Sequence, residues 1–477
     1  MSFTCKSVST NTLLSIAFGF ASLAFLTEAR ASSKAEIDAL FSVDSRNQFA
    51  LEVEAAIATA QADRGVIPKA AAREIASKAS IEFAPQPDIT EEYGRVRHRM
   101  VALLNVWKRS LNEEARDYVH YGVTTVDVYD TVKILQLKRT IEFLVADMRA
   151  IEIQLMDLAE AHKETPMVGR TLGQHALPIT FGKKVAVWAS VNRRNIERLK
   201  EVYERIDQLG VLKGAVGTHL GLGPEGAKIE RKAAKLLGIA SSEPADWHGA
   251  RDVFAEYALT LGLIAKSYAA IGGEVFRLQM TDIGEIYEKR SAAAIGSSTM
   301  PHKRNPSLSE ALIHYGRTIP RKAEVLLDDV ENAFERDNTS RPNRVLEEVS
   351  TEAASMVRDA GRLIDRLEID DASMLQNLAI TDGVLTAQRV VLHLAPDIGR
   401  EEAEERVRGA AKNAIETPAS FRDALLADPI LTPLLDGSID ALLDPTTYLG
   451  LASEQVDSTM AHLKRLRKTD GDYLPSH

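Results

Sequence analysis

Cysteine is almost absent from this chain of 477 residues, which has only Cys5. A single thiol can form neither an internal disulfide nor a multi-cysteine metal cluster. The 11 histidines include no HExxH pair or comparable ligand spacing. We therefore expect neither a metal nor any other cofactor that depends on such clusters.

An excess of positive charge is also missing. The chain has 58 Lys and Arg against 68 Asp and Glu, a formal net charge of −10. No broad basic surface for nucleic acid is expected from this balance. A small anionic substrate remains compatible with it, because a local cationic pocket can form in an acidic protein. Hydrophobic residues at 45% and charged residues at 26% are typical of a globular chain and exclude a multi-span membrane protein.

Only one long apolar run occurs, at residues 13–26. It follows Lys6 and precedes the small-residue sequence Ala29-Arg30-Ala31, as in a secretory signal peptide. The run is too short to span a bilayer. Since the positive region is a single lysine and the rest of the sequence is typical of a cytoplasmic metabolic enzyme, we expect a cytoplasmic protein with a leader at residues 1–34. Export through this leader is the alternative.

The remaining chain is rich in helical periodicity and poor in alternation. Apolar residues recur every three or four positions in four long segments, which predicts helices at residues 131–163, 184–209, 253–288 and 307–334. Pro320 should kink the last of them. These helices exceed the usual mean of about 11–12 residues. Their length predicts an all-α, extended bundle whose apolar stripes are buried further by oligomerisation.

The strongest chemical signal lies between two of these helices, in the sequence GSSTMPHKRNP at residues 296–306. Ser297 and Ser298 supply hydroxyl oxygens, and Lys303 and Asn305 follow as donors that can hold a carboxylate. As residue types alone, the serines are equally compatible with a helix N-cap.

This string resembles the signature of the fumarase/aspartase superfamily. Residues 120–127 (HYGVTTVD) are similar to the first block of that family and residues 169–178 (GRTLGQHALP) to its second. Residues 214–218 (GAVGT) resemble a glycine turn of adenylosuccinate lyases. The blocks follow the family order and cover roughly residues 36–460.

The resemblance implies an all-α, three-domain protomer whose long central bundle assembles into a homotetramer, with each active site built from three chains. The implied division is an N-terminal domain at residues 35–118, a central domain at 119–366 and a C-terminal domain at 367–477. The implied chemistry removes a proton next to a carboxylate of a small polycarboxylate and expels a group from the neighbouring carbon. The carbanion is held as an aci-carboxylate by donors that bind it more strongly as charge develops. No cofactor is required.

Site residues carry over from the matched blocks. Ser298 matches the catalytic base, with Ser297 as a weaker candidate, and His120 resembles a histidine that faces the substrate. Glu310 matches the glutamate that orients the general-acid histidine. The matched or candidate substrate-binding residues are His98, Thr124, Thr125, Thr171, Gln174, Lys303, Asn305, Arg336, Ser340 and Arg344.

One position departs from the family pattern. Leu172 stands where fumarases and adenylosuccinate lyases have the acid histidine, and leucine cannot transfer a proton. His175 is the nearest replacement, although it can equally shape the loop. The HYGVTT sequence, the GAVGT turn and Glu335-Arg336-Asp337, which resembles the start of an adenylosuccinate lyase segment, favour a lyase that releases fumarate by C–N cleavage, whereas the missing histidine favours a cycloisomerase. A 3-carboxy-cis,cis-muconate cycloisomerase, which also lacks this histidine, and a non-catalytic structural paralogue are the alternatives.

Overall fold

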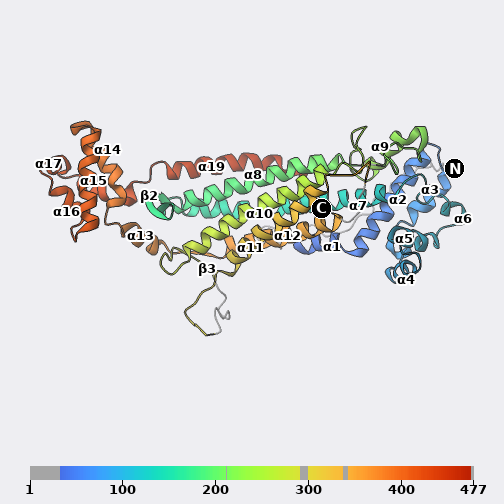
Figure 1. Cartoon of the computed structure of the whole chain (residues 1–477), viewed down its shortest axis with the longest axis horizontal. Helices are drawn as coiled ribbons and strands as arrows, with labels where there is room; N and C mark the ends of the chain where they lie inside the picture. The colour runs from blue at the N-terminus through green and yellow to red at the C-terminus, as the bar shows by residue number, and fades with distance from the viewer. Residues whose placement is uncertain (1–32, 211, 290–298, 337–341, 474–477) are drawn as a thin grey trace, which may run out of the picture.

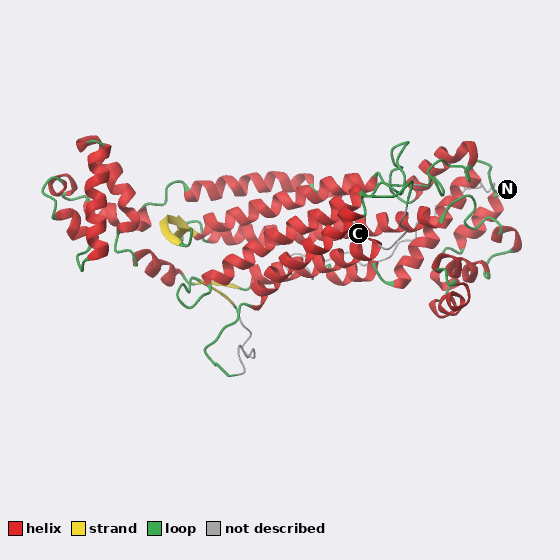
Figure 2. Ribbon diagram, viewed as in Figure 1, coloured by secondary structure: helices red, strands yellow, loops and turns green. Residues whose placement is uncertain are grey.

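The computed structural model describes residues 33–210, 212–289, 299–336 and 342–473. Figure 1 shows an elongated molecule with a long helical bundle in the middle and a cluster of shorter helices at each end. Nearly all regular structure is helical, as Figure 2 shows, with a few short strands near one end of the bundle. The expected all-α fold is confirmed.

Five long helices form the bundle and alternate in direction along it. They are α7 (Thr125–Ala161), α8 (Phe181–Asp207), α10 (Asp252–Leu278), α11 (Ser307–Asp328) and α12 (Pro342–Asp365). Their inward stripes bury one continuous apolar cluster, which includes Leu144, Trp188, Tyr268, Leu312 and Val357. The helix repeat therefore places the sequence's apolar stripes where we expected them.

Two of the predicted helices are too long. The segment predicted at 253–288 ends as α10 at Leu278, and a turn and the strand β3 (Ile286–Glu288) follow. The segment predicted at 307–334 ends at Asp328. Short apolar runs after each true end extend the helical pattern without helical structure, a known ambiguity of periodicity. The helix α11 continues through Pro320, which lies in its interior.

The N-terminal helices pack at one end of the bundle around a second apolar cluster. The short α9, from the middle of the chain, lies against α2 and joins this cluster. The helix α1 (Lys34–Leu40) instead packs on α12 and α7 of the bundle. The elements of this end are α2 (Val43–Asp63), α3 (Lys69–Ser77), η1 (Ile81–Phe83), α4 (Gln86–Val96), α5 (Arg99–Lys108), α6 (Glu113–Arg116), η2 (Gly223–Glu225) and α9 (Gly226–Leu236).

The opposite end carries a third apolar cluster, built from the helices that follow the bundle. The elements that build this cluster are η3 (Val384–Thr386), α14 (Ala387–Ile398), α15 (Arg400–Glu416), α16 (Phe421–Leu426), α17 (Leu431–Leu435) and α18 (Ile439–Leu443). Before them α13 (Asp371–Ala379) connects the bundle to this end, and η4 (Pro445–Thr447) follows them. The chain then returns along the bundle as α19 (Ala452–Leu466), which packs against α8 and α7. The expected domain boundaries stay a prediction.

Two small antiparallel sheets lie near this second end. The hairpin of β1 (Pro166–Thr171) and β2 (Gln174–Thr180) follows α7 directly, within a segment expected to be a loop. The strand β3 pairs with β4 (Leu367–Ile369), which follows α12. No described helix has the length and apolar character needed to cross a membrane.

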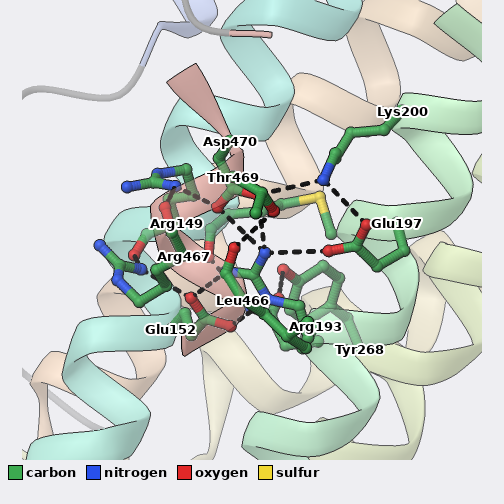
Figure 3. A network of polar contacts seen from close by, with 12 residues as sticks. Arg149, Glu152, Arg193, Glu197, Lys200, Tyr268, Leu466, Arg467, Thr469 and Asp470 are labelled. Atoms are coloured by element: carbon green, nitrogen blue, oxygen red, sulfur yellow. Dashed lines mark hydrogen bonds and ion pairs between the residues drawn. The ribbon is translucent and has the colours of Figure 1, made fainter. Parts of the chain in front are cut away.

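The last residues of the described chain are fixed by a buried ion network (Figure 3). Asp470 is fully buried and accepts bonds from Arg149, Arg193 and Lys200, on α7 and α8. Glu152, equally buried, pairs with Arg193 at 2.5 Å and with Arg467 at 2.6 Å. This network joins the short helices η5 (Arg467–Thr469) and η6 (Gly471–Tyr473) to the bundle.

We expect Asp470→Asn to lower the free energy of unfolding by about 3–5 kcal/mol, because it leaves buried cations without their counter-charge. Urea denaturation measures the change. The control is Asp457→Asn on α19, whose carboxylate is 58% exposed and pairs with Lys163. Its expected cost is below about 1 kcal/mol. Equal costs for the two variants would contradict a structural role of the buried network.

Candidate functional site

The first block lies where the chain enters α7. Thr124 is the N-cap residue and Thr125 is the first helical residue. The free N–H groups and the dipole of a helix N-terminus favour an anion, so both threonines lie where a carboxylate can bind. The block therefore offers carboxylate recognition through local helix geometry.

His120 is held at the same place by a buried carboxylate. Its Nδ1 lies 2.6 Å from Oε1 of Glu54, and its backbone N–H donates to Oε2 at 3.0 Å. Glu54, on α2, is only 2% exposed. Burial alone would lower the pKa of His120, but the bond to Glu54 outweighs it and raises the pKa. Glu54 thus fixes the imidazole and favours its charged form.

Asp127 ties the first block to two distant segments. Its buried carboxylate accepts bonds from the backbone N–H groups of Thr124 at 2.9 Å, Lys213 at 3.2 Å and Gly214 at 3.1 Å. His248 adds a fourth partner, with its Nε2 2.9 Å from Asp127 Oδ1. The Asp127 side chain therefore holds three segments together: the start of α7, the GAVGT turn and the segment before α10.

His248 lies between two carboxylates and is itself only 4% exposed. Its Nδ1 is 2.9 Å from Asp130 Oδ2, opposite the bond to Asp127. Burial alone would lower the pKa of His248, whereas the bonds to both aspartates raise it above its ordinary value. Arg251 also donates to Asp130, at 2.7 Å, and to Asp329 at the end of α11, at 3.0 Å. This cluster, called here the Asp127–His248 cluster, joins α7, α10 and α11 at one end of the bundle.

The second block forms the hairpin at the other end. Leu172 and Gly173 make its two-residue turn, with φ of 52° and 78°. Two positive φ angles in such a turn are typical of type I′, for which leucine is a poor residue. The leucine side chain is fully exposed, and its neighbours Thr171 and Gln174 are exposed as well. The hairpin tip therefore presents two polar side chains and one strained apolar side chain outward.

The base of the hairpin is fixed by a buried ion pair. Arg170 forms two bonds to Glu285, at 2.6 and 2.9 Å, and Asn377 of α13 donates to the same carboxylate at 2.8 Å. His175 lies beside this pair, and its buried Nδ1 has no hydrogen-bond partner. Burial and the charge of Arg170 lower the pKa of His175, so it is mostly neutral near pH 7. It is therefore a weak proton donor in this protomer.

The signature segment departs from the bundle at the same end as the hairpin. Ser297 and Ser298 lie outside the described residues. Glu288 precedes the segment and accepts bonds from the backbone N–H groups of Leu308 and Ser309 after it, at 3.0 and 2.8 Å. One carboxylate thus joins the two ends of the segment and caps α11.

Three predicted residues of this region are described and exposed. Lys303 and Asn305 lie between the signature serines and α11, and Glu310 lies in the first turn of that helix. Because α11 starts at the hairpin end of the bundle, these three residues lie near that end.

The remaining predicted substrate-binding residues are dispersed. His98 is the exposed N-cap of α5, and its Nδ1 accepts a bond from Val101. Arg336 stacks 5.9 Å from the Trp247 ring. Arg344 is exposed and pairs with Glu348 at 3.0 Å. Ser340 lies outside the described residues.

The length of the helices separates the blocks within one chain. Between Thr124 and the hairpin runs the whole of α7, 37 residues or about 55 Å at 1.5 Å per residue. Lys303 precedes α11, a 22-residue helix of about 33 Å whose far end is bonded to the Asp127–His248 cluster. Side chains cannot span such distances. The protomer brings His120, Thr124 and Thr125 together, but not these with Thr171, Gln174, Lys303 or Asn305.

Sequence reasoning missed the residues that fix this geometry. Glu54, His248, Glu285 and Glu288 lie outside the three blocks, and no local pattern distinguishes them from surface residues. Asp127 lies inside the first block, three residues after Thr124, which is the spacing of a capping pair. In the described parts of the chain no three His, Cys, Asp or Glu side chains gather as metal ligands do.

Comparison with known proteins finds relatives along most of the chain. A family model described as lyase matches residues 30–320, and one described as adenylosuccinate lyase C-terminus matches residues 383–459. N-acetyl-S-(2-succino)cysteine lyase of Dickeya dadantii (strain 3937) is 35% identical, over 90% of this chain and 94% of its own.

Two further relatives have different activities. Adenylosuccinate lyase of Methanocaldococcus jannaschii is 34% identical over 90% of this chain and 94% of its own. The crystal structure of 3-carboxy-cis,cis-muconate lactonizing enzyme from Pseudomonas putida superposes with a TM-score of 0.84 at 30% identity, covering 91% of this chain and 98% of that one.

The Asp127–His248 cluster predicts a pH-dependent stability. The pKa of His248 is raised in the folded state, so its charged imidazole stabilises the fold. This stabilising free energy is complete below the unfolded pKa of about 6.5 and is lost as pH rises through the folded pKa. We expect His248→Gln to cost on the order of 3 kcal/mol at pH 6, and clearly less at pH 9.

Urea denaturation of both proteins at pH 6, 7.5 and 9 measures this difference. The exposed His462→Gln on α19 is the matched control and should cost little at any pH. A His248→Gln cost that does not change with pH would contradict a charged imidazole between the two aspartates.

Proposed function

Because the chain belongs to the fumarase/aspartase superfamily of lyases, in the branch of the adenylosuccinate lyases and the 3-carboxy-cis,cis-muconate cycloisomerases, we propose that it catalyses β-elimination from a succinyl-type substrate. The products are fumarate and an amine released by C–N cleavage. The observation that supports this proposal is the N-terminus of α7, where Thr124, Thr125 and the Glu54-bound His120 lie together at a helix end that favours anions.

The proposed reaction balances without a cofactor. Ser298 takes the proton from the carbon next to one carboxylate, as its match to the family base implies. The electron pair moves into that carboxylate, which becomes the aci-form stabilised by Lys303 and Asn305. The C–N bond then breaks, the double bond of fumarate forms, and the amine leaves with a proton.

Departure of the amine requires a proton donor near the nitrogen. Leu172 occupies the matched acid position and carries no proton, while His175 is the nearest titratable side chain. A lowered pKa makes His175 a poor donor in the isolated protomer. A second copy near the hairpin can raise this pKa if it brings a carboxylate close to the imidazole.

A second candidate, the cycloisomerase, is favoured by the same leucine. A carboxylate oxygen leaves or attacks without an acid, because its own pKa is low. A thioether substrate is intermediate in its need for a proton donor. Its leaving thiol has a pKa of about 8.5 and departs more easily than an amine. The similarity to N-acetyl-S-(2-succino)cysteine lyase makes thioethers part of the test.

We also propose that the active site is shared among the chains of a homotetramer. This follows from the separation of the blocks in one protomer, where α7 alone measures about 55 Å. The strained and fully exposed Leu172 supports it, because a partner chain would cover this apolar tip. Such an enzyme would act in the cytoplasm, with export through residues 1–34 as the alternative.

A substrate panel tests the proposed function. We expect absorbance near 240 nm to report fumarate from a succinylated amine, and we expect no turnover of carboxymuconate. Only a leaving amine requires protonation by a general acid. His175→Gln should therefore reduce the turnover rate of the amine substrate at least about 100-fold, as removal of a general acid typically does, and change the rate of a thioether substrate little.

The control is His162→Gln, a half-buried histidine at the end of α7 on no predicted block. It should change neither rate. Turnover of carboxymuconate with no fumarate from any succinyl compound would overturn the lyase and select the cycloisomerase.

A further inference from the structure

A cavity of about 620 Å³ lies between the N-terminal helices and the bundle. Its walls come from α2, α4, α5, α7 and the first turns of α12, and it includes four cationic side chains and one carboxylate. These are Arg46, Arg99, Lys133, Arg344 and Glu347. The volume is in the range of small-molecule sites. Arg46 lies 3.8 Å from Glu347, which neutralises only part of the positive charge.

Lys133 is the least expected of these residues. It is 4% exposed, and its ammonium lies 4.9 Å from the centre of the Phe41 ring. Within the described chain no carboxylate forms an ion pair with it. Burial lowers the pKa of Lys133 to about 8. A buried ammonium without a paired anion costs stability, so a structural role does not explain it.

Two buried oxygen atoms in the same wall also have no partner. Gln136 is fully buried and uses its Nε2 to donate to the Leu40 carbonyl at 2.6 Å, which leaves Oε1 without a donor. The Oδ1 of Asn343 is buried and equally unpaired. Both side chains line the cavity. An occupant with N–H or O–H groups would satisfy them.

The cavity continues the face of α7 that begins at the carboxylate-binding position. Thr125, Tyr129, Val132 and Gln136 are spaced by four, three and four residues, so they share one side of the helix. Tyr129 lies about 6 Å and Lys133 about 12 Å along the axis from Thr125. A molecule anchored at Thr125 can therefore extend into the cavity.

We propose that this cavity binds the departing half of the substrate, and that this half is a small organic anion with at least one N–H or O–H donor. The proposal rests on the elimination proposed above. The acidic group pairs with Lys133 and Arg46, while the donor bonds to Gln136 or Asn343. The apolar side chains of Ile89, Met100 and Leu103 in the same wall contact the carbon chain between them.

A matched pair of substrates tests this charge preference. Both carry the succinyl group, and the departing half is either a 2-carboxyethyl or a 3-hydroxypropyl amine or thiol, according to which heteroatom the enzyme cleaves. We expect kcat/KM to be at least tenfold higher for the carboxylate. Equal values for the pair would overturn the proposal.

Substitution of the buried lysine links that preference to the cavity. Lys133→Met should raise KM for the carboxylate substrate at least tenfold, leave the hydroxyl substrate unchanged, and keep or raise Tm. Lys138→Met is the control, because this lysine is also on α7 but lies outside the cavity and pairs with Asp207. An equal loss on both substrates, or a Tm loss larger than the control's, would overturn the assignment.

A binding measurement separates this proposal from the proposed function. Calorimetric titration with inorganic phosphate requires no turnover, and we expect binding to the wild-type protein and to Lys138→Met but not to Lys133→Met. If no succinyl compound releases fumarate, the proposed function fails while the phosphate result still decides the cavity. If fumarate forms but phosphate does not bind, the cavity proposal alone is overturned.

Discussion

The uninterrupted length of α7 is the constraint on which the site depends. Its 37 residues hold the first block at one end of the bundle and the hairpin beyond the other, about 55 Å apart. A helix is rigid over this distance, and α8, which runs in the opposite direction, and α12 pack along it. No side-chain motion within one chain can therefore unite the three blocks. An assembly of several chains, as proposed above, would bring the blocks into one site.

Buried ionic contacts fix both ends of this bundle. At the first end, the Asp127–His248 cluster holds the start of α7 against α10 and the end of α11. At the second end, the Arg170–Glu285 pair holds the hairpin to the turn before β3. Between them, Asp470 joins the end of the chain to α7 and α8. Removing one partner of such a pair is costly, because it leaves a buried charge without its counter-charge.

The two ends of the bundle carry different groups of the candidate site. The first end supplies a helix N-terminus, the histidine His120 and the cationic cavity, all suited to anionic groups. The second end supplies the exposed polar tip of the hairpin together with Lys303 and Asn305. Binding and elimination would therefore depend on different protomers, and the departing half of the substrate would lie on the protomer that anchors it.

Much of the fold could be predicted from the sequence, because apolar side chains repeat every three or four residues along α7, α8 and α11. The end of α10 could not, since the apolar residues of β3 continue the same period. For the candidate site, contiguous motifs predict Thr124, Thr171 and Lys303. Glu54 escaped notice because its bond to His120 joins residues 66 positions apart, and only tertiary packing creates that contact.

The shared site is tested most directly by mixing two inactive variants, His120→Gln and Ser298→Ala. Each is expected to have little activity alone, since each lacks one end of every site. After the chains are dissociated together and reassembled in equal amounts, about a quarter of the sites would draw both intact residues from different chains of a symmetric assembly. We therefore predict recovery of about a quarter of wild-type activity. A mixture that stays as inactive as its components, although mixed oligomers form, would contradict the shared site.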